Sequence, residues 1–156
     1  MKYLGTKFVA LFMMFTICVG CSNIQSQKDK VAAFLSEYIK YSAYVFKIIN
    51  NPKNFKAIDI GDMSMLNKEE REKINKYFSF FADRKAFNAV TMKIVWVGIA
   101  PKYSINEIKI NGNKAIATLT AYIPEKESKS GHKYIFTYLI VKKGWNWRIK
   151  ELIVQR

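Results

Sequence analysis

Apolar residues change their spacing once along the chain, and this change constrains the fold more than any other feature. Over Asp29–Asn50 they recur at steps of three and four, which is typical of an amphipathic helix. A second helix is predicted over about Lys68–Ala82, where Asn67 is a candidate N-cap and Glu70 completes a capping box. From Ala89 onward the spacing changes to two, which indicates strands. Helices are therefore expected to precede strands.

Two turn signals divide the strand-forming part of the chain. Asn111-Gly112 predicts a hairpin turn, because Asn and Gly tolerate positive φ, and Lys143-Gly144 predicts a second turn. Strands are expected over residues 90–97, 103–110, 114–123 and 132–143, with a last strand around Trp147. This order indicates an α+β fold, in which N-terminal helices pack on a curved antiparallel sheet of four to five strands.

The first twenty residues have a different character. Met1–Lys7 carries two lysines and no acidic residue, and about 12 apolar residues follow, interrupted only by Thr16. This apolar run is too short to span a bilayer as a helix, and the pattern is that of a secretory signal peptide. No later apolar run approaches the roughly 18 residues of a membrane span. Removing residues 1–20 takes away Lys2 and Lys7, so the formal charge falls from +14 by two, to +12.

Both cysteines of the chain stand at the end of this segment, as Cys18-Val19-Gly20-Cys21. The stretch resembles the lipobox of bacterial lipoproteins, in which an aliphatic residue, a small or aliphatic residue and Gly or Ala precede Cys. Cys18 departs from the pattern, because Leu is usual there. The resemblance implies that Cys21 receives a diacylglycerol, that the chain is cut between Gly20 and Cys21, and that the new N-terminus is acylated. No other cofactor is expected.

Three other interpretations of the cysteine pair stay open. A redox Cys-x-x-Cys normally opens a helix after a strand, whereas this pair ends a signal sequence. A zinc site needs about four ligands, and His132 is the only other soft ligand in the chain. An ordinary secretory signal would leave an unmodified Cys21. Lipidation has the further advantage that it explains why the mature chain holds no second thiol.

The expected organisation follows from the lipobox. Residues 1–20 form the signal peptide, 21–28 the lipidated cysteine with a short polar tether, and 29–156 the α+β domain. The protein is then held in the cell envelope, facing outside the cytoplasm. Ser22 rather than Asp after the cysteine favours the periplasmic side of the outer membrane, if the organism is Gram-negative. Two acyl chains give stable attachment, whereas each basic residue near an anionic surface contributes only about 1 kcal/mol.

Three stretches of the mature chain resemble a known family. They are the helix over Val31–Ile49, the hairpin INGNKAIATLTAYI over Ile110–Ile123 and the closing stretch LIVKKGWNWRIKEL over Leu139–Leu152. Together they are similar to the nuclear-transport-factor-2-like fold, also called cystatin-like, and more narrowly to small bacterial lipoproteins of that fold with uncharacterised domains. The resemblance covers about residues 28–154 and implies a cone between helices and sheet. A scaffold does not fix a function.

Enzymes of that fold place an acid, a Tyr or a His inside the cone, and their residues cannot be matched here. We therefore assign no catalytic residue and no metal ligand; His132 is expected in a solvated loop, and Asp59 and Asp62 in turns or caps. One group of residues could line the cone from the sheet, either around an apolar ligand or simply as core. These residues are Trp96, Tyr122, Phe136 and Tyr138.

Two classes of function are compatible with the sequence. The first is a non-catalytic binding or assembly module, for which the resemblance offers a precedent in a periplasmic scaffold of type IV secretion systems. The second is a small hydrophobic-ligand carrier or an enzyme that uses the cone. Expected partners are the membrane through the lipid, anionic envelope lipids or polymers through the +12 charge, and an envelope protein complex. Export argues against nucleic acid, although Lys142–Lys150, KKGWNWRIK, is basic and aromatic.

Overall fold

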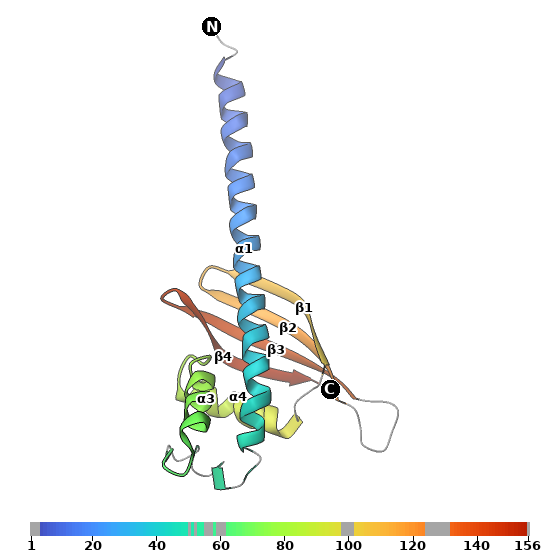
Figure 1. The fold of residues 1–156 in the computed structure, drawn as a ribbon. Helices are drawn as coiled ribbons and strands as arrows, with labels where there is room; N and C mark the ends of the chain where they lie inside the picture. Colours follow the sequence, from blue (N-terminus) through green and yellow to red (C-terminus); the bar gives the residue numbers. More distant parts are fainter. Residues whose placement is uncertain are drawn as a thin grey trace.

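The computed structural model describes residues 4–49, 51, 53–54, 58, 62–97, 102–123 and 132–155, with side chains from residue 23 onward except at 95–97, 102, 123 and 132. Within these residues, helices α1, α3 and α4 precede a four-stranded antiparallel sheet (Figure 1). The α+β fold with N-terminal helices is therefore confirmed. The elements are α1 (Leu4–Ile49), α3 (Lys68–Phe78), α4 (Arg84–Val97), β1 (Lys102–Asn111), β2 (Lys114–Ile123), β3 (His132–Lys143) and β4 (Asn146–Gln155).

The sheet is a meander of order β1-β2-β3-β4, and α1 crosses one face of it (Figure 1). Both predicted turns are present as two-residue loops, because Asn111 pairs with Lys114 and Lys143 pairs with Asn146. Gly112 has a φ of 55° and Gly144 a φ of 60°. Glycine at the first loop position supplies the backbone conformation that matches the strand twist, so each loop joins its strands without extra residues.

The free edge of β4 is partly covered by the segment that follows α3. The N–H of Ile149 donates to the carbonyl of Phe80, and the N–H of Ala82 donates to the carbonyl of Ile149, both at 2.8 Å. Phe81 is thereby paired with Ile149 in a parallel bridge. These bonds satisfy backbone groups that an open edge would expose, and they fix the end of α3 against the sheet.

The core lies between the helices and the covered face of the sheet. Small residues of β2 at alternate positions, Ala115, Ala117 and Ala121, are buried on this face. Because their side chains are short, larger rings from the helices occupy the space above them. From α1 the core receives Val31, Leu35, Tyr38, Val45 and Ile49, and from the other helices Ile74, Tyr77, Ala86, Phe87 and Val90.

Tyr38 lies at the centre of this core. Its ring centroid is 5.7 Å from those of Tyr77 and Tyr138 and 5.8 Å from those of Phe80 and Phe81. The Tyr38 and Tyr77 hydroxyls are 3.5 Å apart. Burial, and then the neighbouring tyrosine hydroxyls, raise the pKa of Tyr38 well above its ordinary value; burial also raises the pKa of Tyr77 and of Tyr138.

One predicted strand is wrong: residues 90–97 belong to helix α4. Val90 and Thr91 are buried together, one helical turn after Ala86 and Phe87, whereas Met92 is 43% exposed. The apolar residues at 90, 94 and 97 satisfy helical steps of four and three, whereas those at 90, 92, 94 and 96 satisfy alternation. The sequence pattern was therefore compatible with both structures, and packing against β4 selects the helix.

Helix α1 is confirmed over residues 29–49, but it also extends through the expected tether. Gln25 donates to Asp29 at 2.9 Å and Gln27 donates to Asn23 at 3.3 Å, which are pairs one helical turn apart. Asp29 therefore lies within the helix and does not cap its start. Within the described part of the chain, no helix has the length and hydropathy needed to cross a membrane.

The predicted capping box of α3 is confirmed. The Glu70 N–H donates to Asn67 Oδ1 at 2.9 Å, and the Asn67 N–H donates to Glu70 Oε2 at 3.0 Å. Asp62 serves a turn as expected, because its carboxylate accepts the Ser64 N–H at 2.9 Å, and hydrogen bonding from Ser64 lowers its pKa. Asp59 lies outside the described residues.

Replacing the cap of α3 should destabilise the protein. Asn67→Ala removes the acceptor for the Glu70 N–H, so we expect the free energy of unfolding to fall by about 1 kcal/mol in urea titrations followed by circular dichroism. Asn75→Ala, an exposed position inside the same helix, should have no such cost, because Ala is the better helix former. Equal losses in the two variants would contradict a capping role.

The buried tyrosines should make stability fall at high pH. Above the ordinary tyrosine pKa of about 10 the unfolded chain loses phenolic protons that the folded chain retains, so the free energy of unfolding falls as pH rises, by up to about 1.4 kcal/mol per pH unit for each tyrosine. Urea titrations from neutral pH upward should show a smaller fall for Tyr138→Phe. The exposed control Tyr44→Phe should keep the wild-type slope. Identical slopes in all three proteins would refute this linkage.

Candidate binding site

The structure separates the residues that were expected to line the cone. Phe136 and Tyr138 are buried on the helix-covered face of the sheet. Tyr122 pairs with Lys133 on the opposite face and is 54% exposed. Trp96 lies in α4, and its side chain is outside the described residues. Tyr122 therefore cannot share a pocket with Phe136 and Tyr138, and the latter two fill the core.

The other residues singled out by sequence fall largely beyond the description. Gly20 and Cys21 belong to α1 and His132 begins β3, but their side chains are not described. Lipidation and cleavage therefore stay predictions. Among the described residues, no group of three or more His, Cys, Asp or Glu side chains is placed to hold a metal ion.

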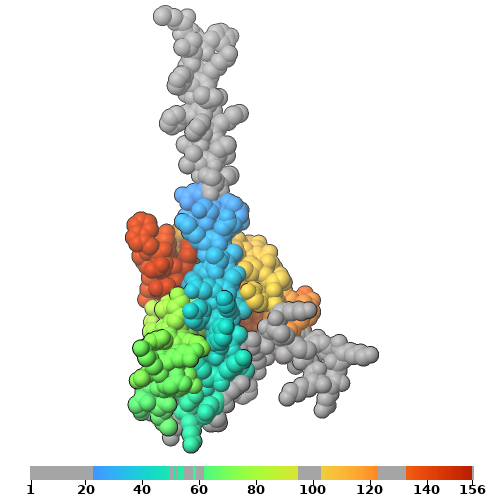
Figure 2. Space-filling model, in the orientation of Figure 1, coloured from blue at the N-terminus to red at the C-terminus, as the bar shows by residue number. Residues whose placement is uncertain are grey.

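A groove of about 750 Å³ lies on the surface beside α1, and we call it the hairpin groove. Its walls are residues 23–37 of α1, the end of α3 with the residues that follow it, and the β3–β4 hairpin, which stands beside α1 in Figure 2. Both aromatic rings and cationic side chains line these walls. The lining residues are Asn23, Gln27, Lys30, Ala33, Phe34, Glu37, Lys76, Ser79, Phe80, Lys142, Trp145, Asn146, Trp147 and Arg148.

Positive charge predominates in the hairpin groove. Four cationic side chains line it against the single carboxylate of Glu37, which is paired with Lys76 at 3.0 Å. The Lys142 amine lies 6.0 Å from the ring centroids of both Trp145 and Trp147. Lys30 also contributes an amine, and Arg148 donates to the carbonyl of Trp147 at 3.0 Å. Amines placed beside aromatic faces suit an anionic or polar ligand.

One buried polar atom at this groove has no hydrogen-bond partner. Gln27 donates its amide to Asn23, but Gln27 Oε1 is buried and accepts no hydrogen bond among the described residues. An unsatisfied buried acceptor is costly, so a ligand or water that donates a hydrogen bond here would stabilise the structure. Gln27 Oε1 therefore marks a point on the α1 side of the groove where a ligand could donate a hydrogen bond.

The sequence pattern indicates only the hairpin wall of this groove, through the basic and aromatic stretch Lys142–Lys150. Its two tryptophans have different roles, because Trp147 is buried and Trp145 is the exposed second residue of the turn. The contribution of α1 could not be anticipated, since its groove residues lie more than a hundred positions away in the chain.

The outer face of the sheet is a second candidate surface. Exposed apolar side chains at Ile116, Tyr122 and Ile153 stand on this face, and Thr118 and Thr137 lie between them on paired strands. A mixed threonine and isoleucine surface of this kind is compatible with solvent and also with a protein partner.

Comparisons with protein-family models, with curated proteins and with solved structures give no significant match to this chain. The order of helices and strands is compatible with a nuclear-transport-factor-2-like fold, and the structure establishes the coarser α+β class.

Proposed function

We propose that the mature protein is a lipid-anchored protein of the bacterial cell envelope whose domain is a non-catalytic binding or assembly module. One observation carries the choice of a binding role: among the described residues, packed rings around Tyr38 occupy the space between helices and sheet, while the charged groove and the apolar sheet face lie on the surface. Ligands of an interior site need a cavity, whereas partners of an assembly module need exposed surface.

The alternative, a hydrophobic-ligand carrier or an enzyme that uses the cone, has less support. The polar residues buried in the described part of the chain are Ser42, Thr91 and Thr120, and Tyr138 is in contact with Tyr38 rather than with a carboxylate or an imidazole. An acid or base beside a tyrosine would have favoured this alternative.

The nuclear-transport-factor-2-like assignment belongs to the same proposal. Its support is the long α1 laid across a curved antiparallel meander, together with the hairpins around Gly112 and Gly144. The support for envelope location is the basic start, the short apolar run and the lipobox-like Cys18-Val19-Gly20-Cys21. If the organism is Gram-negative, Ser22 favours the periplasmic side of the outer membrane.

Lipidation is tested by metabolic labelling with an alkyne fatty acid. The wild type should be labelled and Cys21→Ala should not, because the thiol of Cys21 is the proposed attachment site. Cys18→Leu is the matched control: it replaces the other cysteine, which lies in the discarded segment, and should be labelled at least as well as the wild type. Equal labelling of wild type and Cys21→Ala would refute lipidation at Cys21.

The binding role is tested with a photo-crosslinking amino acid placed at three exposed positions. Ala33 reports on the hairpin groove, Ile116 on the outer face of the sheet, and Arg71 on α3 is a control away from both. After irradiation of intact cells, defined adducts should form at Ala33 or Ile116 several-fold more than at Arg71. Uniform crosslinking at all three positions, together with a small molecule that is extracted from the purified protein, would instead support the carrier.

A further inference from the structure

The tip of the β3–β4 hairpin carries a tryptophan, Trp145, that is not part of the core. Trp145 is 94% exposed, although it is among the largest apolar side chains in the chain. It occupies the second position of a two-residue loop, so its backbone is held by the flanking pair Lys143 and Asn146. The base of the hairpin is fixed by Ile140 and Ile149, which are fully buried. The ring is therefore presented on a rigid support.

This tip lies at the end of the domain from which α1 leaves (Figure 1). Asn23 of α1 and Trp145 line the same groove, and Cys21 is two residues before Asn23 in the same helix. At 1.5 Å per residue, Cys21 is about 3 Å further along the helix axis. A lipid on Cys21 would thus bring the bilayer surface to the level of Trp145.

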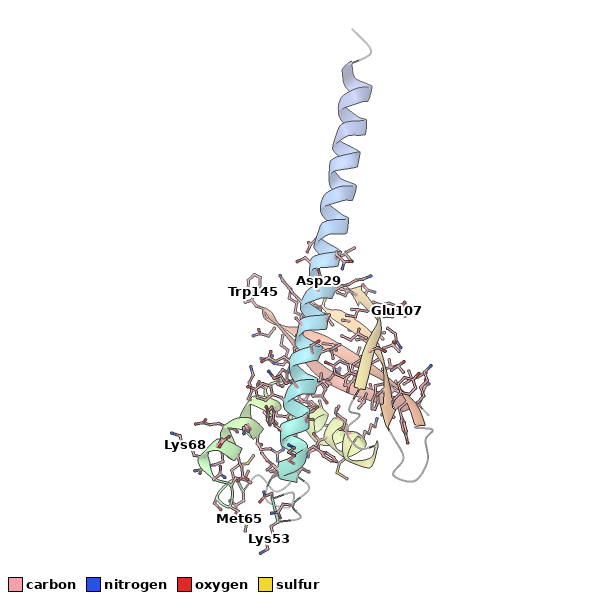
Figure 3. The ribbon with its side chains drawn as sticks, turned by 45° about the vertical axis from the view of Figure 1, so that its right-hand side comes forward. Asp29, Lys53, Met65, Lys68, Glu107 and Trp145 are labelled. Carbon is pink, nitrogen blue, oxygen red and sulfur yellow. The ribbon has the colours of Figure 1, made fainter. Side chains whose placement is uncertain are left out.

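The β1–β2 turn lies at the same end. The Lys142 N–H donates to the carbonyl of Asn113 at 2.8 Å, which holds the two hairpin tips side by side. In Figure 3, Trp145 and Asp29 lie near this end of the domain, while Lys53, Met65 and Lys68 lie at the opposite end. The domain therefore has a near end and a far end relative to the proposed anchor.

Charges at the near end are mainly positive. Its cations include Lys28 and Lys30 of α1, Lys114 after the first turn, and Lys142, Lys143 and Arg148 beside the second. Of the acidic groups near them, Glu37 is paired with Lys76 and Glu107 with Lys109 at 3.1 Å, whereas Asp29 accepts from the neutral amide of Gln25 and keeps its charge. Lys30 and Lys114 are exposed and Lys28 and Lys142 are half-buried, so positive charge surrounds the exposed indole.

We infer that the β3–β4 hairpin tip is a second membrane contact, in which Trp145 enters the headgroup region of an anionic phospholipid bilayer and the surrounding lysines bind lipid phosphates. This inference rests on the proposed function, because the anchor at Cys21 sets which end faces the bilayer. Indole rings concentrate at membrane interfaces, where an apolar body and a polar N–H are both satisfied. Lysines near an anionic surface each add attraction of about 1 kcal/mol.

The contact would orient the domain rather than attach it. The acyl chains on Cys21 supply attachment, so the loss of Trp145 should leave the protein on the membrane. A second contact restricts the tilt of α1 and holds the near-end rim of the hairpin groove against the headgroups. The outer face of the sheet and the far end around Met65 would then remain accessible to partners.

The test uses the mature lipidated protein reconstituted in phosphatidylglycerol vesicles, with or without brominated acyl chains that quench tryptophan. The emission of Trp145 is the difference between wild type and Trp145→Phe, a change at an exposed side chain that the core does not require. Brominated lipid should remove most of this emission. The matched control is Met65→Trp in the Trp145→Phe background: the added tryptophan lies at the exposed far end and should keep its emission.

Two charge variants test the role of phosphate. Lys142→Glu should reduce quenching of Trp145, and Lys68→Glu, at the far end, should not. Raising the ionic strength from about 0.1 M to about 1 M shortens the Debye length from about 10 Å to about 3 Å, so quenching should weaken with salt. Equal quenching in phosphatidylcholine vesicles and at high salt would overturn the part of the inference that assigns anionic lipid.

Flotation of the same vesicles separates this inference from the proposed function. Protein that floats but whose Trp145 is not quenched refutes the hairpin contact and leaves the anchor intact. Protein that does not float refutes the anchor. Protection of Trp145 that requires an added envelope protein, in place of lipid, would also overturn the inference and identify the tip as a protein contact.

Discussion

The structure depends on the packing of Tyr38 between elements that are distant in the sequence. Its ring meets Tyr77 of α3, Tyr138 of β3 and the segment that bonds to the edge of β4. Edge-to-face and stacked aromatic contacts bury large area and add directional preferences. One side chain of α1 thus contacts both α3 and the sheet. These contacts fix the register of α1 on the sheet.

Because rings around Tyr38 pack between the helices and the sheet, the candidate binding surfaces lie on the outside of the domain. The same register places residues 23–37 of α1 beside the β3–β4 hairpin, where Asn23, Lys30 and Phe34 complete a groove with Trp145 and Trp147. The groove lies at the end of the domain next to Cys21, so a lipid anchor and a charged, aromatic surface would be neighbours. Attachment and recognition can therefore share one end of the molecule.

Local signals predicted much of the fold. The capping box of Asn67 and Glu70 and the glycines of both hairpins act through neighbouring backbone groups, so their outcome needs no tertiary partner. Residues 90–97 were predicted wrongly because alternation and helical spacing overlap in a short apolar run. The expected cone-lining group mixed two faces of the sheet, because Tyr122 and Phe136 belong to opposite sides of the pleat.

The sequence by itself determined that helices precede strands, the positions of the two hairpin turns and the candidate lipidation site, because each depends on residues close together in the chain. The tertiary structure alone decided that α4 is a helix, that the interior is filled and that α1 meets the β3–β4 hairpin. Those outcomes depend on contacts between residues far apart in the chain. Trp145 in the turn and Trp147 at the start of β4 are an example. They are two positions apart in the chain, and packing against α1 and the sheet determines that Trp147 is buried while Trp145 is exposed.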